Sequence, residues 1–275
     1  MVDGWQRVGT AAVGVPLFLA AVFLLPPLGF LALLSVLFGW ASLEFVSIAR
    51  VWAPGAPLAA LPPLAVLCGV LLGLERAVAP LPPEAVWAAA LVLSVGVGSL
   101  ILLSRTPVAE APAAFGVFAF GIPYFGLPIG SLCQLQRQDP WLVLLLVAVV
   151  WLGDSAAWWV GSMWGRRRLA PVVSPRKTWE GAAAGFVVAV AATAAWSLAR
   201  LGRLDGGVLA VGSATAVAAQ VGDLVESIFK RSVRLKDSGS VLPGHGGLFD
   251  RADALLFAAP VLWLGLALIG LPAPR

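Results

Sequence analysis

Charged residues are rare in this apolar chain, and many of them gather in one polar segment near its C-terminal end, residues 227–253. This segment holds three aspartates and the only histidine, His245, and a fourth aspartate, Asp223, lies just upstream. Charged groups are costly near hydrocarbon, so such a cluster needs a functional reason. Carboxylates bind divalent cations, and closely spaced cationic side chains neutralise phosphates. The segment therefore predicts a site for a metal ion and a polyphosphate.

The residues that lead into this segment share one face of an expected helix. Asp223, Glu226, Ser227 and Lys230 stand at positions i, i+3, i+4 and i+7. One interpretation is a functional carboxylate site, and the other is an acid–lysine ladder that neutralises itself at the membrane edge. Asp223 lies more than a full helical turn inside the Lys230–Arg231 cation pair, which favours a function.

The middle of the segment is rich in glycine and is followed by two more carboxylates. Glycines such as Gly246 and Gly247 let the backbone approach a phosphate with its N–H groups. Asp250 and Asp253 occupy the first turn of the last expected helix, either as partners of the helix dipole or as oxygen ligands for Mg²⁺. His245 has no second histidine or suitably spaced cysteine for a zinc site, so we expect it to form hydrogen bonds.

A second polar loop, residues 164–180, offers hydroxyl groups and cations. Ser174, Lys177 and Thr178 stand just before an expected helix start, which suits phosphate binding, although an ordinary helix-start turn has the same composition. Asp154 is an isolated carboxylate within an apolar run. It is a functional candidate for that reason, and a buried hydrogen bond between helices is the alternative.

Composition indicates the elements that position these residues. The chain is 60% hydrophobic and 12% charged, which is typical of an all-α, polytopic membrane protein and not of a soluble domain. Its two cysteines match no metal spacing and are expected to be buried thiols. The net charge of +4 is not taken as a nucleic-acid signature, because cations in membrane proteins mark the cytoplasmic side. About nine membrane spans are expected, at residues 8–25, 28–48, 57–74, 86–104, 113–133, 141–163, 181–200, 207–229 and 252–271.

Lysine and arginine distribution sets the expected orientation. With the N-terminus in the cytoplasm, most of the 18 basic residues fall on the cytoplasmic side. Both polar loops, 164–180 and 230–251, then face the cytoplasm, where nucleotides are available. We therefore divide the chain into N-terminal membrane helices, residues 1–140, and a C-terminal catalytic membrane region, residues 141–275.

The polar segment resembles the signature of the phosphatidate cytidylyltransferases, also called CDP-diacylglycerol synthases. That signature reads Ser-x-x-Lys-Arg, then Lys-Asp-x-Gly, then Pro-x-His-Gly-Gly-x-x-Asp-Arg-x-Asp. It is met by Ser227, Lys230, Arg231, Lys236, Asp237, Gly239, Pro243, His245, Gly246, Gly247, Asp250, Arg251 and Asp253. Residues 174–181 and the Gly153-Asp154 segment also look like the family's, so the resemblance covers roughly the C-terminal half. Ala252, Ser155 and Trp158 depart from the usual pattern, and these departures concern local packing.

The resemblance implies transfer of a cytidylyl group from CTP to phosphatidic acid, which yields CDP-diacylglycerol and pyrophosphate. The lipid phosphate is already anionic, so catalysis should rest on positioning and on charge neutralisation by Mg²⁺, with a two-ion clamp as a variant. The expected metal ligands are Asp223 and Asp250, with Glu226, Asp237 and Asp253 as further candidates for binding the metal or supporting its ligands. The expected catalytic residues are Asp223, Asp250, Lys230, Arg231, Lys236, Asp237, His245, Arg251 and Asp253. The expected substrate-binding residues are Ser174, Lys177, Thr178, Ser227, Gly246, Gly247 and Asp154.

Two other functions stay open at this point. A CTP-dependent lipid kinase would release CDP, and an ion-coupled transporter would use Asp154 and Asp223 as relay groups. Polar residues concentrated at one membrane face argue against transport. The expected partners are CTP, phosphatidic acid and the lipid bilayer, with a homodimer as an open possibility and no nucleic acid. The lack of an added targeting segment favours a bacterial inner membrane, with the active site towards the cytoplasm.

Overall fold

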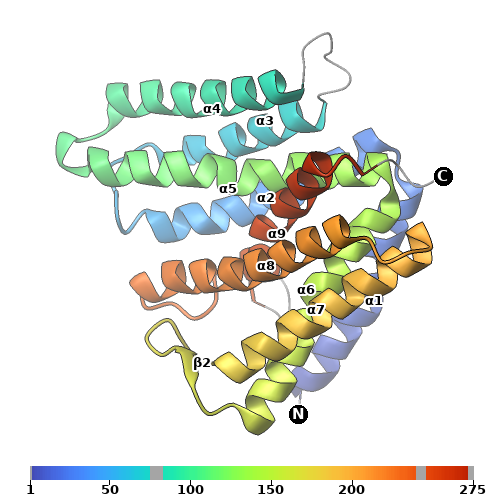
Figure 1. Ribbon diagram of the computed structural model, residues 1–275. Helices are drawn as coiled ribbons and strands as arrows, with labels where there is room; N and C mark the ends of the chain where they lie inside the picture. Colours follow the sequence, from blue (N-terminus) through green and yellow to red (C-terminus); the bar gives the residue numbers. More distant parts are fainter. Residues whose placement is uncertain (1, 75–82, 240–245, 272–275) are drawn as a thin grey trace. The chain divides into compact units, whose positions relative to one another are not determined.

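Long helices and one short hairpin make up the protein in the computed structural model, which describes residues 2–74, 83–239 and 246–271 (Figure 1). The elements in chain order are α1 (Val2–Leu24), α2 (Pro27–Ala49), η1 (Leu58–Ala60), α3 (Leu61–Gly73), α4 (Pro83–Arg105), η3 (Val108–Glu110), α5 (Ala111–Gln138), α6 (Pro140–Trp164), β1 (Arg168–Ala170), β2 (Ser174–Thr178), α7 (Trp179–Leu201), α8 (Gly206–Ser232) and α9 (Phe249–Leu268).

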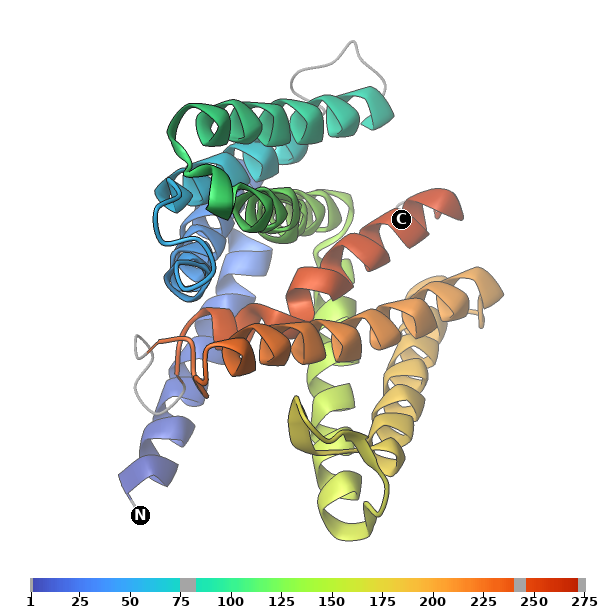
Figure 2. The ribbon, with the colours of Figure 1, turned by 90° about the vertical axis from the view of Figure 1, so that its left-hand side faces the viewer.

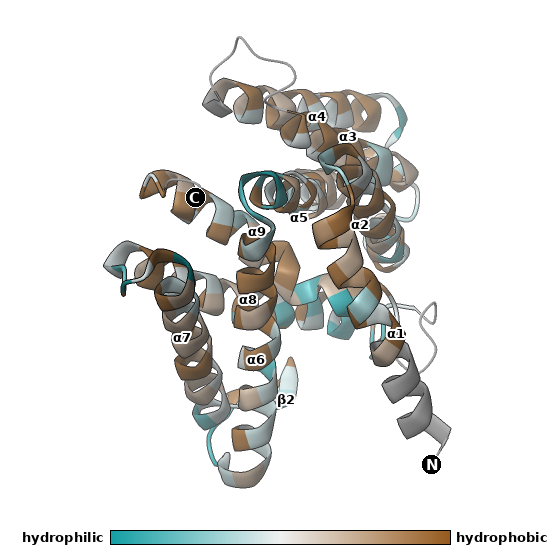
Figure 3. Cartoon of the chain, turned by 90° about the vertical axis from the view of Figure 1, so that its right-hand side faces the viewer, coloured by the Kyte–Doolittle hydropathy of each residue, from teal (hydrophilic) through white to brown (hydrophobic). Residues whose placement is uncertain are grey.

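Within the described ranges, seven helical segments are long and apolar enough to cross a membrane. Hydrophobic residues run along α4 and α7, and hydrophilic residues lie near the ends of α7 (Figure 3). Two of the nine expected spans correspond to shorter apolar helices, Ala12–Leu24 and Leu58–Gly73. The polytopic helical membrane fold predicted from composition is confirmed, whereas the count of nine spans and the orientation stay predictions.

The hairpin of β1 and β2 is a feature that the all-α prediction did not include. The two strands are antiparallel, with Arg168 opposite Thr178 and Ala170 opposite Ser174. The expected loop 164–180 carries two prolines, and proline interrupts helical hydrogen bonding. Backbone pairing within the hairpin satisfies N–H and C=O groups that a helix would otherwise satisfy.

The helices divide into two compact units. The first comprises residues 1–133 and 232–252, and the second comprises residues 134–231 and 253–275. These units are defined by how residues pack and not by their part in catalysis. The predicted division at residue 140, which separates a catalytic region from the N-terminal helices, therefore stays a prediction.

In the second unit, α6 packs along α7 (Figures 1 and 2). Small residues recur every four positions on both helices, at Gly153, Ala157 and Gly161 on α6 and at Gly181 and Gly185 on α7. A Cβ atom at Gly181 would lie 2.5 Å from the carbonyl oxygen of Ala157, and one at Gly185 would lie 2.7 Å from that of Gly153. The helices are therefore in backbone contact, as small residues permit in membrane proteins.

Both of these helices have defined starts. The Asp139 carboxylate accepts a hydrogen bond from the backbone N–H of Trp141, with Pro140 in the first turn of α6. The Thr178 hydroxyl accepts one from the N–H of Gly181 at the start of α7. Because the helix starts are capped, the residues next to them have fixed backbone positions.

In the first unit, an aromatic cluster packs around the start of α9. Phe249 is fully buried, and its ring centroid lies 6.0 Å from that of Phe45 on α2 and 5.6 Å from that of Phe125 on α5. These contacts anchor the polar segment to the N-terminal helices. Cys68 and Cys133 are buried free thiols, as expected.

Candidate active site

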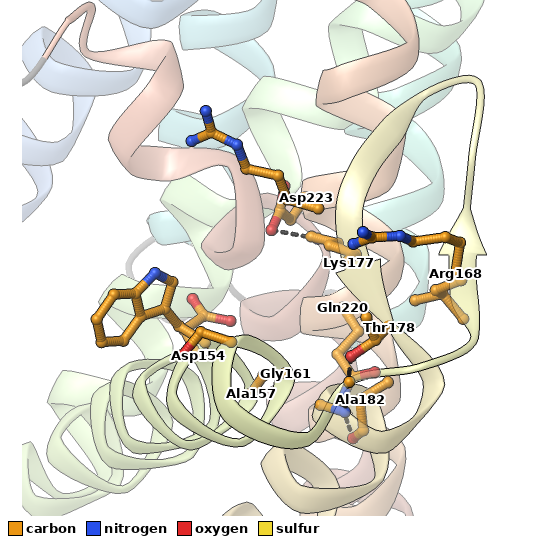
Figure 4. A pocket seen from close by; sticks show the side chains of 15 residues that line it. Asp154, Ala157, Gly161, Arg168, Lys177, Thr178, Ala182, Gln220 and Asp223 are labelled. Carbon is orange, nitrogen blue, oxygen red and sulfur yellow. Dashed lines mark hydrogen bonds and ion pairs between the residues drawn. The ribbon is translucent and has the colours of Figure 1, made fainter.

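A cavity of about 520 Å³ lies in the second unit and opens among α6, the hairpin, α7 and α8 (Figure 4). Its lining combines the small-residue surface of α6 and α7 with polar side chains. Those polar residues are Asp154, Ser162, Arg168, Arg176, Lys177, Thr178, Gln220 and Asp223. The cavity therefore brings together Asp154, residues of the polar loop 164–180 and Asp223 on α8, and it offers three cations and two carboxylates to a ligand.

The hairpin places Lys177 in this cavity. Lys177 is the last residue before the α7 cap Thr178, whose side chain is 3% exposed. The Glu180 carboxylate accepts hydrogen bonds from the backbone N–H groups of Arg166 and Arg167, at 3.2 and 3.3 Å. These bonds tie the chain that enters the hairpin to the first turn of α7. The backbone at Lys177 is thus held by the Thr178 cap that follows it and by the bonds between Glu180 and the chain that enters the hairpin.

Lys177 forms an ion pair with the carboxylate of Asp223 on α8 (Figure 4). Gln220, one turn earlier on α8, donates a hydrogen bond to the carbonyl oxygen of Ala182 on α7, at 3.0 Å. Asp154 lines the same cavity from α6. The predicted substrate-binding residues Asp154, Lys177 and Thr178 are therefore neighbours of one cavity, together with the predicted metal ligand Asp223.

Asp223 also belongs to a group of three carboxylates. One oxygen atom from each of Asp223, Glu226 and Asp253 lies within 4.8 Å of the others. Gly222 makes this possible, because a Cβ atom there would lie 2.6 Å from the carbonyl oxygen of Asp253. Only a residue without a side chain allows α8 and α9 to approach so closely.

The charge of this group is partly balanced by two lysines. Lys230 Nζ lies 2.6 Å from the carboxylate of Glu226, which is 1% exposed, and Lys177 pairs with Asp223. Three carboxylates so close together repel one another strongly away from bulk water. The acid–lysine pair expected on this face of α8 therefore exists, and its carboxylates also meet a third one from α9, while a function for the group stays a prediction.

Asp250, the other predicted metal ligand, lies in the first unit. Its carboxylate accepts hydrogen bonds from the backbone N–H groups of Ser238 and Gly247, at 2.9 and 2.8 Å. Gly246 has φ +80°, in the left-handed region that favours glycine, and a Cβ atom there would lie 2.7 Å from an oxygen of Asp250. Asp250 thus organises the glycine-rich backbone, and its assignment as a metal ligand stays a prediction.

The remaining predicted residues occupy varied positions. Arg231 donates from Nε to the carbonyl oxygen of Val173, at 3.4 Å, which ties the end of α8 to the hairpin turn. Ser174 on β2 and Ser227 on α8 are half-buried and are not among the described residues that line the cavity. Three charged residues of the first unit are exposed, Lys236, Asp237 and Arg251. His245 lies outside the described residues.

One residue that we did not predict contacts the polar segment directly. Glu44 on α2 is 8% exposed, and its carboxylate accepts hydrogen bonds from the Ser238 hydroxyl and from the backbone N–H groups of Leu248 and Phe249. Its signal in the sequence is a single carboxylate in the apolar run 28–48, the same signal that identified Asp154.

Comparison with known proteins finds similar sequences over much of the chain. The profile of the cytidylyltransferase family matches residues 5–269. A phosphatidate cytidylyltransferase of Bacillus subtilis is 47% identical over 121 residues, which are 44% of this chain and 45% of that protein. One from Brucella melitensis is 42% identical over 147 residues, 52% of this chain and 54% of that protein. A third, from Haemophilus influenzae, is 40% identical over 124 residues, 43% of each protein.

The matched regions span about half the length of these relatives. The family profile, by contrast, extends over nearly the whole chain, including the N-terminal helices that the signature does not reach. On this match, the chain belongs to the cytidylyltransferase family.

Proposed function

We propose that this protein transfers a cytidylyl group from CTP to phosphatidic acid, with Mg²⁺, at the cytoplasmic side of a bacterial inner membrane. The observation that carries the proposal is the carboxylate group of Asp223, Glu226 and Asp253, which shares Asp223 with a cavity lined by Arg168, Arg176 and Lys177. Asp223 thus belongs both to a group of carboxylates that could bind a cation and to a cavity whose cationic side chains could bind phosphates. The choice of substrates follows the name of the relatives, phosphatidate cytidylyltransferase.

The proposed reaction needs no strong base. A phosphate oxygen of phosphatidic acid attacks the α-phosphorus of CTP, the bond from that phosphorus to the bridging oxygen breaks, and pyrophosphate leaves with the bond's electron pair. The barrier is mainly electrostatic, because one anion attacks another. Lys177 and the two arginines of the cavity would neutralise phosphate oxygens and hold them in line, while the closely packed α6 and α7 backbones limit the space around them.

The carboxylate group has suitable chemistry for Mg²⁺, because this ion prefers oxygen ligands and is usually held by one or two carboxylates together with substrate phosphates. Asp223 and Asp253 are half-buried, whereas Glu226 is buried and is therefore the least accessible of the three carboxylates. We therefore propose Asp223 and Asp253 as the carboxylates that hold the ion, and the assignment of Asp250 as a metal ligand stays a prediction from the sequence alone. Bound there, Mg²⁺ would neutralise charge on the nucleotide phosphates and on the leaving pyrophosphate.

Two features support the cytoplasmic orientation. Glu44 lies near the end of α2, just before Arg50, and contacts the polar segment, so both belong to the same membrane side. The polar segment carries the basic residues Arg234, Lys236 and Arg251 in the same unit as Glu44, and basic residues favour the cytoplasm. A homodimer stays an open prediction.

The test is pyrophosphate release by detergent-purified protein given CTP, phosphatidic acid and Mg²⁺. Release should need both substrates and should stop with EDTA. Asp223→Asn should lower the rate by more than about 100-fold, because a bound metal supplies several kcal/mol to such a reaction. CDP release in place of pyrophosphate would indicate a lipid kinase and overturn the proposal.

Asp205→Asn is a matched control on the same helix. Asp205 caps the opposite end of α8, where it accepts from the N–H groups of Gly207 and Val208 at 3.0 and 3.1 Å. Asparagine caps helices as well as aspartate, and the exposed Arg203–Asp205 pair contributes little. The control should therefore keep normal activity, and an equal loss in both variants would show that Asp223 acts only through folding.

A further inference from the structure

The carboxylate of Glu44, on α2, holds both described ends of the glycine-rich segment. It accepts the Ser238 hydroxyl at 2.7 Å, the Leu248 N–H at 3.1 Å and the Phe249 N–H at 2.9 Å. Ser238 precedes residues 240–245 and the other two donors follow them. Glu44 therefore links two short stretches of backbone that are separated along the chain.

Asp250 links the same two stretches from its own side. The backbone N–H of Ser238 donates to Asp250 while its hydroxyl donates to Glu44, and the N–H of Gly247 also donates to Asp250. Ser238 is thus shared by two carboxylates. Loss of either carboxylate would release one group of Ser238 and leave the other bound.

The packing at this point leaves no room for side chains. A Cβ atom at Gly239 would lie 2.9 Å from Oε1 of Glu44, and one at Gly247 would overlap Glu44 and Ser238. The signature glycines at these positions are therefore explained by contact with Glu44, independently of any ligand. Because Glu44 occupies the space that side chains at Gly239 and Gly247 would need, the backbone can pass this close to it only at glycine.

Energetically, Glu44 is suited to hold this backbone. A buried carboxylate is costly unless it accepts several hydrogen bonds, and such charge-assisted bonds are short and strong. Leu248 and Phe249 supply N–H groups at the start of α9, where the helix dipole also favours a negative charge. The same residue, Phe249, is fixed by the aromatic cluster of α2 and α5.

We propose that Glu44 is a positioning residue for the reaction, which aligns the segment around Ser238, Gly247 and Asp250 with the N-terminal helices. This inference rests on the proposed function, since Asp250 and its neighbours are the expected catalytic residues. It gives the N-terminal helices a defined part in catalysis beyond anchoring the protein in the membrane.

The experiment compares Glu44→Gln with Glu110→Gln. Glutamine keeps the size of Glu44 but removes its charge and one acceptor oxygen. Glu110 is a matched control in the same unit, because its carboxylate also accepts a backbone N–H, that of Gly55 at 2.7 Å. We expect kcat to fall by about 10- to 100-fold in Glu44→Gln, with KM for CTP changed little, because small misplacements of catalytic groups have effects of this size. Glu110→Gln should be unchanged.

Amide hydrogen exchange gives a readout that does not depend on turnover. Exchange at Leu248 and Phe249 should quicken in Glu44→Gln and not in Glu110→Gln, since only the former loosens those N–H groups. Unchanged exchange, or normal kcat with only a lower melting temperature, would overturn the proposal. If the wild-type protein releases no pyrophosphate, the proposed function fails, and the exchange result alone decides whether Glu44 holds the segment.

A double-mutant cycle with Ser238→Ala completes the test. If Glu44 acts through Ser238, the effects of Glu44→Gln and Ser238→Ala on kcat should be clearly less than additive when combined. Additive effects would mean that Glu44 acts elsewhere and would contradict the proposed link. Glu44→Asp, which keeps the charge on a shorter side chain, should recover part of the activity lost in Glu44→Gln.

Discussion

Replacing Lys177 with glutamine should tighten divalent-cation binding and at the same time slow turnover. Lys177 is paired with Asp223, so a cation that uses Asp223 must displace the lysine ammonium. Removal of that competitor leaves the carboxylate available. The phosphates of the proposed substrates, however, lose one of the three cations of the cavity.

The size of the effect follows from the exposure of the pair. Two unit charges 4 Å apart attract by about 4 kcal/mol at an effective dielectric constant of about 20. The side chains of Lys177 and Asp223 are 27% and 28% exposed, and solvent screening reduces such pairs towards the 0–1 kcal/mol measured at surfaces. We therefore expect about 1.4 kcal/mol, which is about tenfold in cation affinity.

The assay is Mn²⁺ binding to the detergent-purified protein by electron paramagnetic resonance, without nucleotide, alongside pyrophosphate release. Lys177→Arg keeps the positive charge and serves as the matched control, with Mn²⁺ affinity close to that of the wild type. Equal or weaker Mn²⁺ binding in Lys177→Gln would refute the reasoning, because it would mean that the cation does not use Asp223.

Two further predictions concern packing and orientation. Gly181→Ala should lower the melting temperature, since overpacking against the Ala157 carbonyl oxygen at 2.5 Å costs about 1–3 kcal/mol, whereas Gly96→Ala, with nothing within 4 Å of the added Cβ atom, should not. Equal melting temperatures would contradict backbone contact between α6 and α7. Val172 and Leu204 lie beyond opposite ends of α7 and are 89% and 57% exposed. A cysteine placed at Val172 should react with an impermeant maleimide added on the cytoplasmic side, and a cysteine placed at Leu204 should react with one added on the outer side. The reverse pattern would overturn the proposed orientation, and the native cysteines are buried.

Local pattern was sufficient to predict the helices and part of the candidate site. The spacing of Asp223, Glu226 and Lys230 places them on one helix face, and the structure pairs Glu226 with Lys230 as that spacing allows. A helix start just after residues 174–178 followed from their types, and α7 begins at Trp179 with Thr178 as its cap. These features depend on residues a few positions apart, whose geometry a helix fixes.

Contacts between distant parts of the chain could not be read from such patterns. Glu44 and Ser238 are 194 positions apart, and nothing local to α2 indicates which segment its carboxylate meets. Asp253 joins Asp223 only because Gly222 lets α8 and α9 approach closely. The hairpin was missed because strands of three and five residues in a basic loop have no clear alternation of polar and apolar residues.

The charge of the proposed site implies that its ligands favour one another's binding. Asp223, Glu226 and Asp253 bring three carboxyl groups together with only two ammonium groups, those of Lys177 and Lys230, so acidic groups outnumber basic ones before any substrate binds. A nucleotide triphosphate brings further negative charge and would draw Lys177 towards its phosphates, which leaves Asp223 exposed to like charge. A divalent cation can take the place of the lysine on Asp223. It would then reduce both the repulsion among the carboxylates and the repulsion between Asp223 and the nucleotide phosphates. The ion and the nucleotide should therefore bind cooperatively, with Lys177 exchanging partners between them.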